Sequence, residues 1–230
     1  MKRKFVLERI WKNIVSLMAL GTLFFALAGT VNVLGFWIYV AVVLLYQIVS
    51  LLIIVPRYPA YMTLANERKA KHANVKKWDK RVVLVLTMAT FLMYGLAALD
   101  LGRFHVGELS LGFALPGIAL YVAGSALNQW AMLCNPHFER GVRIQEERGH
   151  RVADTGPYRY VRHPGYLGSV LFYVAFPLMV GSAAALFGSI VGIVGMIVRT
   201  GLEDRTLKEE LAGYTEYARV TRCRLIPYVW

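Results

Sequence analysis

The sequence predicts an all-α, polytopic integral membrane protein, and three observations carry this prediction. Of the 230 residues, 57% are hydrophobic and only 17% are charged, and the mean hydropathy is +0.48. A soluble domain has about 25% charged residues. Long apolar runs recur along the chain, and the Lys and Arg residues gather between them. Together these features argue against an ordinary soluble domain and favour several membrane-spanning helices.

The apolar runs define about six helices. One bilayer span needs about 20 apolar residues. The run at 167–198 is too long for one span, and Pro177 and the Gly-Ser pair at 181–182 lie near its middle. We therefore expect this run to form a helical hairpin, which supplies the fifth and sixth helices. The four earlier runs cover residues 13–31, 34–55, 82–101 and 109–133.

The basic residues predict how these helices are oriented. With six crossings, the N-terminus, the loops 56–81 and 134–165 and the tail 199–230 share one side, and they hold 25 of the 26 Lys and Arg residues. Only Arg103 lies on the other side. By the positive-inside rule the shared side is cytoplasmic. Both termini are expected there, in the plasma (inner) membrane if the protein is bacterial.

Two features of the chain have competing interpretations. The basic cluster at 2–4, the apolar stretch after it and the Ala-Leu-Ala sequence at 26–28 resemble a cleavable signal peptide, so cleavage of the first helix stays open. The net charge of +12 would also suit a nucleic-acid binder. Because most of the chain lies in apolar spans, nucleic acid is not an expected partner.

Cysteine and histidine spacing does not indicate a metal site. Cys134 and Cys223 match no zinc or redox motif, and we expect both to be reduced thiols. Cys134, His137, His150 and His163 can be drawn as a ligand set, but no HxxxH or CxxC pair is present. No metal is therefore expected.

Polar and ionisable residues concentrate in two segments, 134–166 and 199–227, which flank the predicted hairpin. Because a hairpin returns the chain to the side it came from, we expect the two segments to form one site at the cytoplasmic surface. Pro157 and Pro164 make the first segment stiff and irregular. Irregular backbone near a membrane has to be buried in protein or line a cavity, so a ligand site is predicted here.

Two motifs in these segments resemble those of a known family. Residues 156–168 read Gly-Pro-Tyr-Arg-Tyr-Val-Arg-His-Pro-Gly-Tyr-Leu-Gly. Residues 199–207 read Arg-Thr-Gly-Leu-Glu-Asp-Arg-Thr-Leu, and Tyr214, Tyr217 and an Arg-Leu-Ile-Pro sequence at 224–227 follow. In this order, on either side of an apolar hairpin, they resemble the core and C-terminal motifs of the isoprenylcysteine carboxyl methyltransferase family. Related features occur in phospholipid N-methyltransferases.

The resemblance implies a membrane methyltransferase that uses S-adenosyl-L-methionine and acts on a lipid or hydrophobic small-molecule acceptor, with no obligate protein partner. It divides the chain into N-terminal transmembrane helices (1–133) and a cofactor-binding and catalytic region (134–230). The family's substrate-facing arginine falls on Arg199, one helical turn before Glu203, and these two are the expected catalytic residues. The implied cofactor contacts are Gln145, His150, Arg151, Val152, Ala153, Tyr158, His163, Pro164, Gly165, Tyr166 and Glu203.

Two departures from the family pattern are visible. The family often has a second Glu where this chain has Asp204, and the spacing between Gln145 and His150 is shorter than in the eukaryotic enzymes.

The residue types suit this chemistry. A carboxylate acceptor needs an anchor, and Arg199 can hold one bidentately, whereas an amine acceptor has to lose a proton to Glu203 or Asp204. A long apolar cavity is expected for the acceptor.

Neighbouring residues have plainer interpretations. Arg162 either takes part in the site or only contacts headgroups or loop carbonyls, and Gln129 faces either the cavity or the interface. We expect Tyr214 and Tyr217 to be aromatic anchors at the membrane interface.

Two other function classes were weighed. A membrane NADPH-dependent reductase of the sterol-reductase type carries a similar Arg-His-Pro-x-Tyr-x-Gly string, but there an Asp usually follows the Gly, and here Ser169 follows. A non-catalytic membrane protein would leave a dense and costly polar cluster without a use. The methyltransferase is therefore the leading interpretation, and the reductase is the alternative.

Overall fold

The chain is helical, and the all-α prediction is confirmed. The computed structural model describes residues 2–58, 74–227 and 229–230. Within these ranges the only β contact is one isolated bridge between Glu108 and Ser182. The long helices are α1 (Lys2–Ala28), α2 (Leu34–Arg57), α4 (Lys77–Leu99), α5 (Ala114–Cys134), α6 (Pro164–Val180) and α7 (Ala185–Glu210), and a short helix α8 (Tyr214–Val220) follows.

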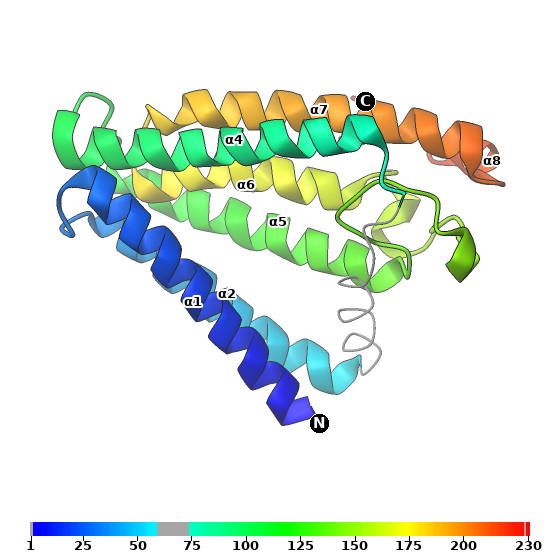
Figure 1. Ribbon diagram of the computed structural model, residues 1–230, viewed down its shortest axis with the longest axis horizontal. Helices are drawn as coiled ribbons and strands as arrows, with labels where there is room; N and C mark the ends of the chain where they lie inside the picture. The colour runs from blue at the N-terminus through cyan, green and yellow to red at the C-terminus, as the bar shows by residue number, and fades with distance from the viewer. Residues whose placement is uncertain (1, 59–73, 228) are drawn as a thin grey trace.

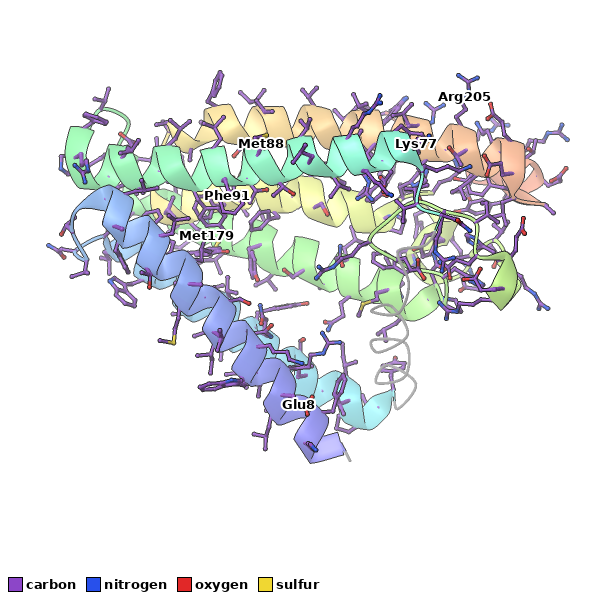
Figure 2. All side chains as sticks on the ribbon, viewed as in Figure 1. Glu8, Lys77, Met88, Phe91, Met179 and Arg205 are labelled. Carbon is purple, nitrogen blue, oxygen red and sulfur yellow. The ribbon has the colours of Figure 1, made fainter. Side chains whose placement is uncertain are left out.

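Within the described ranges, five helical segments are long and apolar enough to cross a membrane. They are α1, α2, α4 with its π-helical extension η1 (Asp100–Phe104), α5 with the preceding 3-10 turn η2 (Leu111–Phe113), and α7. Helix α6 is also apolar but has 17 residues. Figure 2 shows Met88 and Phe91 on the outside of α4, where they are 64% and 58% exposed, whereas Met179 of α6 is fully buried. The chain is thus an integral membrane protein whose outer helix faces suit lipid.

The long apolar run at 167–198 is divided between α6 and α7. The residues 181–184 connect the two helices, and Gly181 ends α6 in the left-handed conformation with φ 83°, as glycine commonly does at a helix end. Helix α7 continues beyond the apolar run to its last turns near the cleft. Arg199 and Glu203 of the second motif therefore lie on one continuous helix.

Successive helices alternate in direction, as the colours in Figure 1 show. Helices α4 to α7 run side by side, and the α1–α2 pair packs against them at one end and diverges from α5 toward the other end. The packed end holds an aromatic core, in which the rings of Phe24 and Phe36 stack 3.8 Å apart and Tyr39 lies 5.1 Å from Phe176. The loop that carries the first motif lies at the other, open end (Figure 1).

Glycines permit close contacts between neighbouring helices. A Cβ atom on Gly168 of α6 would lie 2.5 Å from the carbonyl oxygen of Gly124 on α5. On α7, a Cβ atom on Gly188 would lie 2.5 Å from the backbone nitrogen of Met93 in α4. Such small-residue contacts let helix backbones approach closely in a membrane. They bring α7 beside α4 and α6 beside α5, which positions the two motifs.

Candidate functional site

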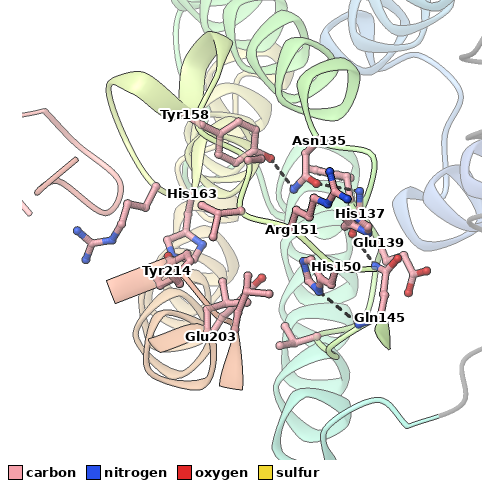
Figure 3. A pocket seen from close by; sticks show the side chains of 18 of the residues that line it. Asn135, His137, Glu139, Gln145, His150, Arg151, Tyr158, His163, Glu203 and Tyr214 are labelled. Atoms are coloured by element: carbon pink, nitrogen blue, oxygen red, sulfur yellow. Dashed lines mark hydrogen bonds between the residues drawn. The ribbon is translucent and has the colours of Figure 1, made fainter. Parts of the chain in front are cut away.

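A polar cleft lies at the open end of the bundle, where the two sequence motifs meet (Figure 3). Its walls come from the loop 135–153, the 3-10 turn η4 (Gly156–Arg159), the first turn of α6, the last turns of α7 and helix α8. It contains about 770 Å³ of space, its open mouth included. Pro164 is buried in the first turn of α6 and does not line it. The other predicted cofactor residues all line it: Gln145, His150, Arg151, Val152, Ala153, Tyr158, His163, Gly165, Tyr166 and Glu203.

Gly156 turns the chain into the cleft. It has φ 58°, and a Cβ atom at this position would lie 2.4 Å from Sγ of Cys134, so another residue would be strained and would collide. Pro157 then begins η4 and directs Tyr158 inward. The Tyr158 hydroxyl accepts a hydrogen bond from Nδ2 of Asn135 at 3.3 Å. Burial raises the pKa of Tyr158, so this side chain presents a neutral phenol.

Gln145 organises the opposite wall and is 1% exposed. Its Nε2 donates to the carbonyl oxygen of His137 at 2.7 Å, and its Oε1 accepts from Nη1 of Arg148 at 3.0 Å. Its backbone N–H donates to Nδ1 of His150 at 3.3 Å, which leaves the proton of the neutral ring on Nε2. The side-chain groups of Gln145 are therefore already paired, and this residue holds the loop in shape.

Two neutral histidines stand on this wall (Figure 3). The ring centroids of His137 and His150 are 4.5 Å apart. Burial, together with the neighbouring His137 and Arg143, lowers the pKa of His150 to about 4, and burial also lowers the pKa of His137. Among the described residues, Nδ1 of His137 is buried without a hydrogen-bond partner. This wall therefore offers uncharged hydrogen-bonding groups, one of which lacks a partner.

Asp204, where the family often has Glu, joins the two motifs below the cleft. Its carboxylate is 1% exposed and accepts two hydrogen bonds from Arg162, at 2.7 and 3.0 Å. It also accepts from the Tyr214 hydroxyl and from Nε of Arg224, both at 3.0 Å. Nη1 of Arg162 donates to the backbone carbonyls of Thr221 and Arg222 in the C-terminal segment, and Arg162 also lines the cleft. The Asp204 cluster ties α7, the loop and the C-terminal segment together.

Arg199 is held by a partner from α4. Its Nε and Nη2 donate to the two carboxylate oxygens of Asp79 at 2.8 and 3.2 Å, and Nη2 also donates to the carbonyl oxygen of Arg140 at 2.5 Å. The guanidinium lies 4.9 Å over the ring of Tyr166, whose hydroxyl donates to Glu203. Arg199 and Glu203 are therefore connected through Tyr166. No sequence motif indicated Asp79, because it lies 120 positions before Arg199.

A second, larger cavity adjoins the cleft. It contains about 2990 Å³ of space, its open mouth included, and lies between the α1–α2 pair and helices α4 to α7. Arg199 lines this cavity, whereas Glu203 lines the cleft. Gln129 also lines the larger cavity, so of its two interpretations the cavity-facing one holds. Four residues line both spaces, namely Phe138, Glu139, Gly165 and Tyr166.

The prediction that Tyr214 and Tyr217 are aromatic anchors at the membrane interface is wrong. They are 4% and 9% exposed and line the cleft. The Tyr217 hydroxyl donates to the carbonyl oxygen of Tyr158 at 2.7 Å, because α8 folds back over the loop. Sequence reasoning also missed several lining residues, which lie outside the two motifs: Asn135, His137, Phe138, Glu139, Val142, Arg143 and Leu211.

Neither cysteine forms a disulfide. Among the described residues, no three His, Cys, Asp or Glu side chains form a group that could hold a metal ion.

The helices and the two adjoining cavities define a polytopic membrane protein with a polar site at one end of its bundle. Residues 117–209 match the model of the Isoprenylcysteine carboxyl methyltransferase (ICMT) family. This segment runs from α5 through most of α7 and includes both the cleft loop and Glu203. The chain is an integral membrane protein that contains a segment matching the ICMT family, and the predicted resemblance is confirmed. No curated protein matches the chain.

Proposed function

We propose that this protein is an S-adenosyl-L-methionine-dependent methyltransferase whose acceptor is a lipid or another membrane-partitioned molecule. The observation that carries the proposal is the shared wall between the two cavities. Tyr166 and Gly165 line both the polar cleft, which opens at the bundle end, and the larger cavity among the apolar helices. A water-soluble cofactor and a membrane-soluble acceptor can approach each other only at such a boundary. The family match supports methyl transfer as the reaction.

The cleft residues fit the cofactor's chemistry. When bound, S-adenosyl-L-methionine supplies an electrophilic methyl group on a sulfonium centre. The Glu203 carboxylate would pair with its ammonium group or accept from its ribose hydroxyls. The uncharged ring of His150 and the ring of His163 would meet its carboxylate or its adenine edge, and the unpaired Nδ1 of His137 marks a place for one ligand hydrogen bond. Tyr158 would offer an aromatic face to a cation.

The chain's own contribution to the reaction is positioning and exclusion of water. Tyr166 donates a hydrogen bond to Glu203 and is covered by Arg199, so these three side chains form an ordered boundary between acceptor and cofactor. Asp79 and the Arg140 carbonyl engage Nε and Nη2 of Arg199. A carboxylate acceptor would meet the remaining edge of Arg199, and an amine acceptor would lose its proton to Glu203.

The calorimetric test uses purified protein in nanodiscs, titrated with S-adenosylhomocysteine and separately with NADPH. S-adenosylhomocysteine should bind, and Glu203→Gln and His163→Ala should each weaken it about ten- to a hundredfold, since a charge-assisted hydrogen bond is worth roughly 1.5–3 kcal/mol. Glu209→Gln is the matched control, because Glu209 is exposed on the same helix and pairs with Arg205. Binding of NADPH without S-adenosylhomocysteine would reject the proposal. Lipid analysis of cells fed methyl-labelled methionine, with and without the gene, would then identify the acceptor.

We further propose six membrane crossings, with both termini and the cleft on the cytoplasmic side. The placement of 25 of 26 basic residues supports this orientation, as does the alternation of helix directions (Figure 1). In a variant without native cysteines, Lys77→Cys and Arg205→Cys should react with a membrane-impermeant maleimide only after the cells are opened. Val106→Cys at the opposite end, where Val106 is 86% exposed, should react in intact cells. Labelling of Lys77→Cys and Arg205→Cys from opposite faces would contradict the six-span topology.

A further inference from the structure

The larger cavity is more polar than its position among apolar helices suggests. Sequence reasoning expected a long apolar cavity for an acceptor. The structure lines it with apolar side chains and also with uncharged polar ones, ten of which lie on helices α1, α2, α4 and α5. An alkyl or prenyl chain would offer no partner to any of these ten groups that the protein itself leaves unpaired. The ten are Asn13 and Ser16 of α1, Tyr46, Gln47 and Ser50 of α2, Thr87 and Thr90 of α4, and Ser125, Asn128 and Gln129 of α5.

These polar groups reach well below the membrane surface. On α2 they recur at one-turn spacing, so they form a stripe on one face of the helix. Gln47 and Arg57, the last residue of α2, are ten positions apart, which corresponds to roughly 15 Å of helix. The stripe therefore extends the polar environment from the cavity mouth toward the middle of the bundle.

Part of the stripe is satisfied within the protein, and part is not. Gln129 is paired, because its Nε2 donates to Oγ of Ser50 at 3.0 Å and its Oε1 accepts from the Tyr46 hydroxyl at 3.2 Å. Gln47 differs, since its Oε1 is buried and has no hydrogen-bond partner among the described residues. A buried acceptor without a partner is rare in native structures and indicates an unfilled interaction. A ligand hydroxyl or N–H would fill it.

The mouth of the cavity is basic. Arg140 lines it, and the acidic residue there, Glu139, already accepts hydrogen bonds from Arg143 at 2.8 and 3.0 Å. Arg199 is paired with Asp79 and therefore adds no net charge to the mouth. The mouth therefore favours an anionic group on the ligand.

We propose that the larger cavity binds an anionic amphiphile that carries a hydrogen-bond donor below its headgroup, and that this donor pairs with Oε1 of Gln47. This binding preference rests on contacts within the cavity alone. That the bound amphiphile is also the methyl acceptor rests on the proposed function.

The test measures fatty-acid affinity in nanodiscs of dioleoylphosphatidylcholine, a lipid that has no hydrogen-bond donor. The probes are octadecanoate and three hydroxyoctadecanoates with the hydroxyl on carbon 2, 7 or 12, and the readout is the rise of the unfolding temperature with probe concentration. At least one hydroxylated probe should bind the wild-type protein about tenfold more tightly than octadecanoate, as expected for one hydrogen bond to a buried acceptor. The preferred carbon reports the depth of Gln47.

Variants identify the residue responsible. Gln47→Met should reduce the affinity ratio to about one, whereas Gln47→Glu, which keeps an acceptor, should preserve the preference. Leu45→Met is the matched control, because Leu45 is 64% exposed on α2 and does not line the cavity. The proposal would be overturned if the wild-type protein showed no preference for any hydroxylated probe, and this result needs no folded Gln47→Met protein. It would also be overturned if Gln47→Met kept the wild-type preference. S-adenosylhomocysteine titration of the same samples separates this outcome from failure of the proposed function.

Discussion

Replacement of Asp79 by Asn tests whether α4 holds Arg199 at the boundary between the two cavities. Asp79 is fully buried, and its carboxylate accepts two hydrogen bonds from Arg199 and one from the backbone N–H of Val142 at 2.9 Å. An Asn side chain has nearly the same shape but carries no charge and only one acceptor oxygen. The substitution therefore leaves the Arg199 guanidinium buried without a charged partner on α4, while its contacts with the Arg140 carbonyl and the face of Tyr166 survive.

Loss of one partner from a buried ion pair costs about 3–5 kcal/mol. The lower end applies here, because two contacts of Arg199 survive. For a chain of this size, about 3 kcal/mol corresponds to a fall of roughly 6–12 °C in the unfolding temperature. Arg199→Met removes the buried charge, so the double variant Asp79→Asn/Arg199→Met should be less destabilised than the sum of the single variants, by about 1–3 kcal/mol.

Thermal unfolding in nanodiscs, followed by intrinsic fluorescence, measures all four proteins of this cycle. Glu209→Gln removes an equivalent but exposed carboxylate beside Arg205 and should change stability by less than about 1 kcal/mol. Cofactor affinity of Asp79→Asn should stay within a few fold of wild type, because Asp79 does not line the cleft. Wild-type stability in Asp79→Asn, or additive effects in the double variant, would refute the idea that this pair fixes Arg199.

Two further outcomes follow from the site. Asp204→Asn should lower stability by about 3–5 kcal/mol, because it removes the carboxylate that binds Arg162 and the C-terminal segment. Thermal unfolding and limited proteolysis measure this loss. An unchanged unfolding temperature and cleavage pattern would show that Asp204 does not hold these segments together. The pKa of His150 is lowered from 6.5 to about 4 by burial and the neighbouring His137. Between these values the unfolded chain binds a proton that the folded chain does not. The contribution of His150 to the free energy of unfolding is therefore present above about pH 6.5 and is lost as the pH falls toward 4. His150→Asn should flatten the dependence of stability on pH in this range. A variant with the same dependence as the wild type would exclude His150 as the cause of the loss.

The division of the chain into helices could be predicted from the sequence because hydropathy acts locally. Apolar runs report whether a segment can sit in lipid, and Gly181 reports where a helix can end. The helix ends were less predictable. The charged last turns of α7 looked like a tail after the apolar run, but Arg199, Glu203 and Asp204 continue the helix because partners from the loop, α4 and the C-terminal segment satisfy them. The boundary between two regions at 133/134 stays a prediction.

The cleft-lining residues could also be predicted to a large extent, because the two motifs carry them. The predicted cofactor roles of Gln145, His150 and Glu203 remain proposals. Tyr214 was misread because an aromatic residue in a polar C-terminal segment has the same sequence appearance whether it lies at the interface or folds back beneath a loop. The bond from its hydroxyl to Asp204 exists only once α8 is docked.

The sequence by itself determined that this protein lies in a membrane, that it carries the motifs of a methyltransferase family, and which loop and helix carry its polar site. These properties depend on composition and on motifs that are contiguous in the chain. Only the tertiary structure decided that Asp79 neutralises Arg199, that Gln47 presents an unpaired acceptor, and that the cleft and the larger cavity meet at Tyr166. Each of these depends on which helices pack together, and the pairing of residues 120 positions apart leaves no local pattern in a single sequence.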